Sequence, residues 1–75
     1  MFTDTRQLAA KPSKRRLAQI DKLIEAAYYR VARGVQINVM DIGTIYREAT
    51  AAALAGGDGA IEAAVSASVA RLRKN

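Results

Sequence analysis

The sequence predicts a small all-α protein, with three helices in one domain and an extended N-terminal arm. Apolar residues recur at spacings of three and four along most of the 75 residues, sixteen residues are alanine, and glycines stand where helices would end. These three features are typical of short packed helices. We expect helices over 14–33, 39–55 and 59–73, an arm over 1–13, and one helical domain over 14–75.

The arm is predicted because its residues show no helical period. It ends in Lys11-Pro12-Ser13, and a proline disfavours the helical conformation in the residue before it. We therefore expect a flexible or docking segment, in which Phe2, the one phenylalanine of the chain, would act as an anchor.

The first helix is the most clearly marked element. Ser13 directly follows the proline and suits the N-cap, and Gly34 stands where the chain would leave the helix. Between them, one side of the helix is apolar. Its residues are Leu17, Ile20, Leu23, Ile24, Ala27, Tyr28 and Val31.

The stretch 35–40 fits two structures. Apolar residues alternate with the amides Gln36 and Asn38, which is the period of a short strand. Alternatively, Asn38 caps a helix that begins at Val39, with Asp41 favourably placed in its first turn. In that case the residues before Asn38 are only a connector.

With two helices after it, the strand alternative resembles the ribbon–helix–helix family over residues 34–75. The likeness lies in the order of the elements and in the alternation of Gln36 and Asn38. In that family, strands from two chains pair and enter the major groove of DNA, so the resemblance implies a DNA-binding dimer. This sequence departs from the pattern, because a long helix precedes the ribbon and no basic residue lies on it.

The second and third helices are separated by Gly56-Gly57-Asp58-Gly59. Gly56 would close the second helix and Asp58 would cap the third, so we interpret these residues as a turn and not as a phosphate-binding loop. The apolar side of the second helix comprises Ile42, Ile45, Tyr46, Ala49, Ala52 and Ala53, and that of the third comprises Ile61, Ala64, Val65, Ser68, Val69 and Leu72.

No group of residues indicates catalysis. The chain has neither histidine nor cysteine, its seven acidic residues form no paired cluster in the sequence, and no base lies near its serines. Nucleophilic and acid–base mechanisms need such sets, and metal centres need clustered ligands. We therefore expect a protein that is not an enzyme and that has no metal site and no cofactor.

The chain is basic, with twelve Lys and Arg against seven Asp and Glu and a formal net charge of +5. Such a charge favours polyanionic partners. We expect a nucleic-acid-associated protein whose affinity is salt-dependent and mostly independent of sequence. The candidate contacts are Lys11, Lys14, Arg15, Arg16, Lys22, Arg30 and Arg33, and one stripe of the first helix comprises Arg15, Lys22, Tyr29 and Arg33.

The small core predicts self-association. Only sixteen residues are Leu, Ile or Val, and alanine adds little buried apolar area. A dimer or higher homo-oligomer would bury additional apolar area at its interface. Tyr29, Met40 and Leu54 fall off the apolar sides of their helices. They are the candidate residues for contact with a partner.

Two other functions stay open on the sequence. The thin core, the arm and the spare apolar residues also fit a structural or assembly adaptor of a larger particle, such as a phage head, neck or packaging component. The other open function is a small inhibitor of a host enzyme or regulator. Such a protein needs only a small size and an exposed patch that binds its target. Either protein would act through a protein partner.

The expected location is the cytoplasm, or a virion if the chain is a phage protein. No run of eighteen apolar residues and no signal-peptide pattern is present, so we expect no membrane partner. The absence of cysteine fits a reducing compartment.

Overall fold

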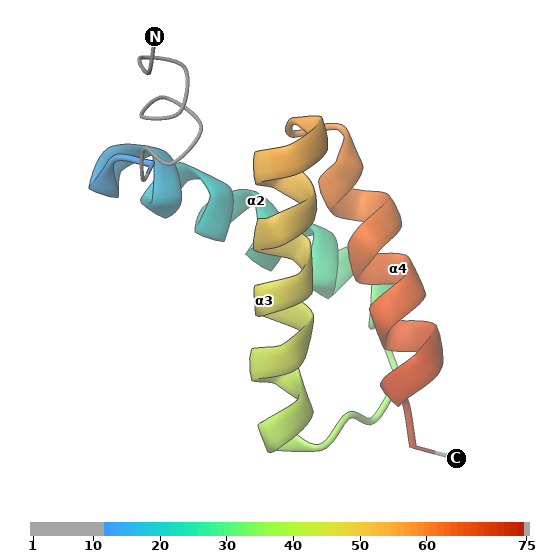
Figure 1. Ribbon diagram of the computed structural model, residues 1–75. Helices are drawn as coiled ribbons and strands as arrows, with labels where there is room; N and C mark the ends of the chain where they lie inside the picture. The colour runs from blue at the N-terminus through green and yellow to red at the C-terminus, as the bar shows by residue number, and fades with distance from the viewer. Residues whose placement is uncertain (1–11, 75) are drawn as a thin grey trace, which may run out of the picture.

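The computed structural model describes residues 12–74, which form three helices (Figure 1). They are α2 (Lys14–Val31), α3 (Val39–Gly56) and α4 (Ala60–Leu72). The all-α prediction is confirmed, and each helix begins and ends within two residues of its expected bounds. Apart from its last two residues, the predicted arm lies outside the described residues.

The helices are arranged with α3 and α4 side by side and with α2 crossing both of them (Figure 1). Each helix contacts the other two, and the closest association is between α3 and α4. The N-terminal turns of α2 extend past α3 on the side away from α4 (Figure 1). Among residues 12–74, no helix is both long enough and apolar enough to cross a membrane.

α2 begins at the residue that the sequence predicts as its cap. The Ser13 side-chain oxygen accepts a hydrogen bond from the Arg16 N–H at 3.0 Å, and the backbone at Ser13 is extended. The helix ends at Val31, and Gly34 follows with a φ of 73°. Because this left-handed conformation costs glycine little, it lets the chain turn sharply toward α3.

The stretch 35–38 is a connector that ends in a helix cap. The Asn38 side-chain oxygen accepts a hydrogen bond from the Met40 N–H at 3.0 Å, so Asn38 caps α3. This is one of the two structures predicted for the stretch. The cap turns the backbone into the helix at Val39, which leaves no room for a longer strand.

The ribbon–helix–helix alternative is therefore wrong. Among the described residues, the connector forms one isolated antiparallel bridge, between Ile37 and Arg73. Beside it, the Lys74 N–H donates to the Gln36 carbonyl at 2.8 Å. The connector is thus paired with the segment that follows α4 in the same chain.

A tight turn joins α3 to α4. Gly57 has a φ of 85°, and its N–H donates to the Ala53 carbonyl at 2.8 Å, which closes α3. The expected cap by Asp58 does not form, because the N-cap of α4 is Gly59 and no side chain bonds to it. The Asp58 carboxylate instead accepts a hydrogen bond from Arg16 of α2 at 2.7 Å.

The core lies between the three helices and consists of isoleucine, valine and alanine. Its buried apolar residues are Ile20, Ile24, Ala27, Ala32, Ile45, Ala49, Ala53, Ile61, Val65 and Val69. All but Ala32 belong to the apolar sides predicted from the sequence. Leu17 and Leu23, predicted to be buried with them, are 40% and 38% exposed because they lie at the borders of the side that α2 turns inward.

Candidate functional site

The basic stripe of the first helix lies on the side of α2 opposite its buried residues. Arg15, Lys22 and Tyr29 are exposed there, Tyr29 by 66%, and the exposed Arg33 follows just after the helix ends. At about 100° per residue, they lie opposite the buried Ile24. We call Arg15, Lys22, Tyr29 and Arg33 the outer face of α2.

Arg16 and Arg30, also predicted as nucleic-acid contacts, lie on another side of α2, toward α4. The Arg16 guanidinium is 2.7 Å from the Asp58 carboxylate, and the Arg30 guanidinium is 2.7 Å from the Glu62 carboxylate. These two ion pairs attach α2 to the start of α4. Within residues 12–74, the outer face of α2 takes part in no ion pair.

The beginning of α2 adds to the positive potential. Lys14 is exposed in the first turn, whereas Lys11, predicted with it, lies outside the described residues. The first turn contains no acidic residue, so the charges of Lys14 and Arg15 add to the positive end of the helix dipole. This end of α2 attracts anions.

Two carboxylates limit the basic surface on the flank of α2 that faces α3. Burial raises the pKa of the Tyr46 hydroxyl above its usual value, and the negative charges of Asp21 and Glu25 raise this pKa further. The same pKa is raised by the Tyr29 and Tyr28 hydroxyls, so the groups of α2 that act on Tyr46 of α3 include two acids and two tyrosines. The sequence places both acids at the edge of the basic stripe, and the structure shows that this edge borders α3.

The exposed ring of Tyr29 is supported by its neighbour. The ring centroids of Tyr28 and Tyr29 are 5.8 Å apart with an interplanar angle of 68°, an edge-to-face arrangement. Tyr28 is partly buried and packs against the core. The ring of Tyr29 therefore keeps a large exposed area while it contacts Tyr28.

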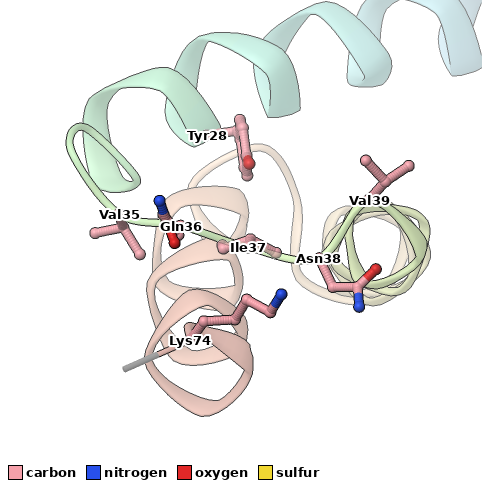
Figure 2. A pocket seen from close by; sticks show the side chains of 7 residues that line it. All are labelled: Tyr28, Val35, Gln36, Ile37, Asn38, Val39 and Lys74. Atoms are coloured by element: carbon pink, nitrogen blue, oxygen red, sulfur yellow. The ribbon is translucent and has the colours of Figure 1, made fainter.

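A shallow pocket opens beside the connector between α2 and α3. Figure 2 shows Tyr28 on one side of the connector and Lys74 on the other, with Val39 at the start of α3. The lining residues are Tyr28, Val35, Gln36, Ile37, Asn38, Val39 and Lys74. Lys74 is the charged side chain of this lining, and no carboxylate, serine or threonine accompanies it.

The side of α3 that faces away from the core presents apolar residues to solvent. Met40 is 82% exposed and Leu54 is 49% exposed, one near each end of the helix. Gly43, Arg47 and Ala51 lie between them on the same side. We call these five residues the outer face of α3. A shallow apolar pocket on this side is lined by Tyr46, Arg47, Thr50, Ala51 and Leu54.

The structure separates the three residues predicted to contact a partner. Tyr29 belongs to the outer face of α2, whereas Met40 and Leu54 share the outer face of α3. Sequence reasoning missed Val39, which is 79% exposed, and it also missed Arg47. Arg47 is seven residues from Met40 and seven from Leu54, so the three residues lie on one side of the helix. This spacing could have placed Arg47 on that side from the sequence alone.

A polar cluster between α3 and α4 was also not predicted. The buried Ser68 hydroxyl donates to one oxygen of Glu48 at 2.5 Å, and Arg71 donates to the other at 2.6 Å. The hydrogen bond from Ser68, followed by that from Arg71, holds the pKa of Glu48 below its usual value. The three side chains satisfy one another, which indicates a structural role. In the described part of the chain, no three potential metal ligands lie together.

Two surfaces therefore stand out in residues 12–74, the basic outer face of α2 and the apolar outer face of α3. No protein family, curated protein or solved structure matches this chain. A function is accordingly inferred from these two faces.

Proposed function

We propose that the protein binds nucleic acid through the outer face of α2. The observation that supports this function is the exposure of Arg15, Lys22 and Arg33 around the exposed ring of Tyr29. They occupy the side of the helix opposite its buried residues. Cations that contact phosphates and an aromatic ring that packs on bases are what proteins use to bind nucleic acid with little sequence preference.

The length of the face suits an extended polyanion. Arg15 and Tyr29 are fourteen residues apart in one helix, which is about 21 Å. This length corresponds to roughly six base pairs of duplex, at about 3.4 Å each, and Lys22 lies midway. Cations spread over this length reach several phosphates, and each neutralised phosphate releases counterions. We therefore expect an affinity that falls steeply as the salt concentration rises.

The other predicted cations have supporting roles. Lys14 increases the positive potential at the beginning of α2. Arg16 and Arg30 hold the carboxylates of Asp58 and Glu62 in ion pairs, so these carboxylates do not act as free negative charges near the phosphate backbone. Both pairs also fix α2 on α4, which keeps the outer face of α2 turned to solvent.

Fluorescence anisotropy with a random duplex DNA at two salt concentrations tests the proposal. The double variant Arg15→Ala/Lys22→Ala should bind more weakly, and its slope of log affinity against log salt should fall by about 0.9 for each lost phosphate contact. The matched control is Arg73→Ala/Lys74→Ala, which removes the same charge from exposed positions after α4. The control should retain most of the affinity of the wild type.

Two results would contradict this function. One is the absence of binding at low salt, and the other is an equal loss of affinity in the two double variants, which would show that only net charge matters. The variant Tyr29→Ala separates the ring from the charges. It should lower the affinity while leaving the salt slope unchanged, because no phosphate contact is lost.

A second function, structural assembly with protein subunits, is favoured by a different observation. Val39 and Met40 are 79% and 82% exposed, and neighbouring exposed apolar residues mark contact surfaces in small proteins. In such an adaptor, the positive charge would complement an acidic protein surface. A protein that fails to bind DNA at low salt and forms stable assemblies would have this second function.

A further inference from the structure

The shallow apolar pocket on α3 lies in the C-terminal half of that helix and has a volume of about 440 Å³. Its lining ends in Leu54, which is 49% exposed. Arg47 Nη2 donates to Thr44 Oγ1 at 3.1 Å, and Nη1 lies 3.6 Å from the position that a Cβ on Gly43 would take. The guanidinium of Arg47 is therefore turned toward the start of α3. It leaves the pocket open over the small side chain of Ala51.

The pocket is on the side of α3 that faces away from α4. Glu48 marks the opposite side, because its carboxylate accepts hydrogen bonds from Ser68 and Arg71 of α4. Tyr46 and Thr50 line the pocket and are two residues before and two residues after Glu48. This spacing places both about 160° around the helix from Glu48. The N-terminal turns of α2 extend past α3 on this same side (Figure 1).

The described chain begins beside the end of α3 that carries the pocket. Pro12 directly precedes the N-cap of α2. One turn into this helix, the Arg16 guanidinium is 2.7 Å from the carboxylate of Asp58, which lies in the turn after α3. The start of α2 is thus close to the C-terminal end of α3, where Leu54 lies. Residues 1–11 therefore join α2 near the pocket.

The segment 1–11 is long enough to cover the pocket. An extended chain spans about 3.3 Å per residue, so Phe2, ten residues before Pro12, is within about 33 Å of it. The pocket extends over eight residues of α3, which is about 12 Å. A tether of this length keeps Phe2 at a roughly millimolar effective concentration near the pocket. This concentration favours the segment of the same chain over a second copy as the occupant.

The segment carries apolar side chains that suit an apolar pocket. Met1 and Phe2 are near one end, and Leu8, Ala9 and Ala10 are near the other. The ring of a phenylalanine has about 150–250 Å² of surface to bury, and aromatic side chains are enriched where one protein surface contacts another. Phe2 is therefore the residue of this segment that gains most from the pocket.

The N-terminal turns of α2 offer a second apolar contact. Leu17 in these turns is 40% exposed, and it lies on the same side of α2 as the buried Ile20, three residues later. That side faces the core, so a segment that runs from Pro12 back to α3 passes Leu17. Leu8 is four residues before Pro12, which allows a distance of about 13 Å. Leu8 therefore reaches Leu17 when the segment folds back.

We propose that residues 1–11 fold back along α3 and dock in its shallow apolar pocket, with the ring of Phe2 against Ala51 and Leu54. The docked segment covers apolar area that α2 and α3 expose without it. It thereby enlarges an apolar core that the three helices alone keep small. The docking does not depend on nucleic-acid binding.

Nuclear magnetic resonance of the full chain tests the contact directly. Phe2 is the one phenylalanine of the chain, so the signals of its ring protons are assigned without ambiguity. Nuclear Overhauser effects should connect these protons to the methyl groups of Ala51 and Leu54. A sample that mixes isotope-labelled and unlabelled chains should show no such effects between chains. A ring without contacts to α3, or with contacts only between chains, would overturn the proposal.

Tryptophan fluorescence tests the pocket. The chain has no tryptophan, so Phe2→Trp places a single probe in the full chain. In Phe2→Trp/Ala51→Lys, a long side chain fills the pocket. Quenching by acrylamide should be several-fold stronger in this double variant than in Phe2→Trp, and the emission should lie at longer wavelength. The matched control is Phe2→Trp/Ala63→Lys, which adds the same charge at an exposed position of α4 and should behave as Phe2→Trp does.

Three results of the quenching experiment would overturn the proposal. Equal quenching in Phe2→Trp and in Phe2→Trp/Ala51→Lys would show that the probe lies outside the pocket. Equally strong quenching in the Ala63→Lys control would show that added charge, and not the pocket, governs the probe. Quenching that weakens as the protein concentration rises would show docking on a second copy. Circular dichroism should show that the variants retain their helices. No sample contains nucleic acid, so a failure of docking and a failure of the proposed function are distinguishable.

Discussion

α3 is joined to its two neighbours by different kinds of contact. Toward α4, a buried hydroxyl on Ser68, the carboxylate of Glu48 and the guanidinium of Arg71 form one polar cluster. Toward α2, the contact is apolar, with Ile20 and Ile24 fully buried. The ion pairs of α2 lie at the exposed edge of this helix and join it to the start of α4, not to α3.

The difference divides the contacts of α3 into one that supplies buried apolar area alone and one that also fixes the alignment of the helices. Large aliphatic side chains contribute most of the buried apolar area, so α2 supplies much of the driving force for folding. The contact of α3 with α4 also buries large aliphatic side chains, Ile61, Val65 and Val69, and its hydrogen bonds in addition require one alignment of the two helices. The variants below test this division, from the largest expected effect to the smallest.

The largest loss of stability should come from Ile24→Ala. Ile24 is completely buried between α2 and the other helices, and its truncation removes apolar contacts and leaves a cavity. We expect a loss of about 3 kcal/mol, which is a large part of the roughly 4–11 kcal/mol available to a chain of this size. Urea denaturation followed by circular dichroism measures this loss. The neighbouring Leu23→Ala, at a position 38% exposed, should cost clearly less, and an equal cost would contradict the division.

Ser68→Ala should have a smaller effect of about 1 kcal/mol. The hydroxyl is buried and donates to Glu48, so its removal leaves the carboxylate with Arg71 as its remaining side-chain donor. Ser66→Ala is the matched control, because Ser66 is exposed on the same helix and should change stability little. Thermal denaturation of the two variants measures the difference. Equal melting temperatures would show that the polar cluster contributes nothing to stability.

The same cluster should make stability depend on pH in the acid range. The pKa of Glu48 is lower in the folded protein than its usual value, because Ser68 and then Arg71 donate hydrogen bonds to its charged form. Unfolded chains therefore bind a proton to this group more readily than folded ones. Its contribution is present in full above the usual pKa of a glutamate and is lost as the pH falls through the folded pKa.

Glu48→Gln isolates this contribution, because every other acidic group is retained. The free energy of unfolding should decrease less steeply with falling pH in Glu48→Gln than in the wild type. Denaturant titrations at a series of acidic pH values give the two slopes. Identical slopes would show that the pKa of Glu48 is the same in the folded and unfolded chains.

The local features of the fold were predictable from neighbouring residues. Ser13 follows a proline and precedes an apolar stripe, and both signals lie within one helical turn. The connector was ambiguous for a physical reason, since alternation and a capping asparagine fit the same residues. What decides between them is the start of α3 at Val39, together with the pairing of Gln36 with Lys74, which lies far along the sequence.

The candidate sites were predictable to a smaller extent. Helical spacing alone placed Arg15, Lys22 and Tyr29 on one side of a helix. The partners of Arg16 and Glu48 could not be predicted, because Asp58 lies in the turn before α4 and Ser68 in α4, and their proximity depends on how the helices cross. Spacing indicates the face on which a residue lies, but only packing shows what that face meets.

The smallest effect should come from Asp58→Ala, which removes the ion pair between α2 and the start of α4. The Asp58 and Arg16 side chains are 48% and 33% exposed, and exposed ion pairs contribute about 0.2–1 kcal/mol. Arg16 also donates to Gln19 at 3.1 Å, so it retains one partner in the variant. We therefore expect a loss at the low end of this range, and the loss should vanish at high salt because the charges are screened. Denaturant titrations of Asp58→Ala and of the wild type at low and high salt measure the difference. A loss as large as that of Ile24→Ala would show that the exposed ion pairs, and not the isoleucines, hold α2 in place.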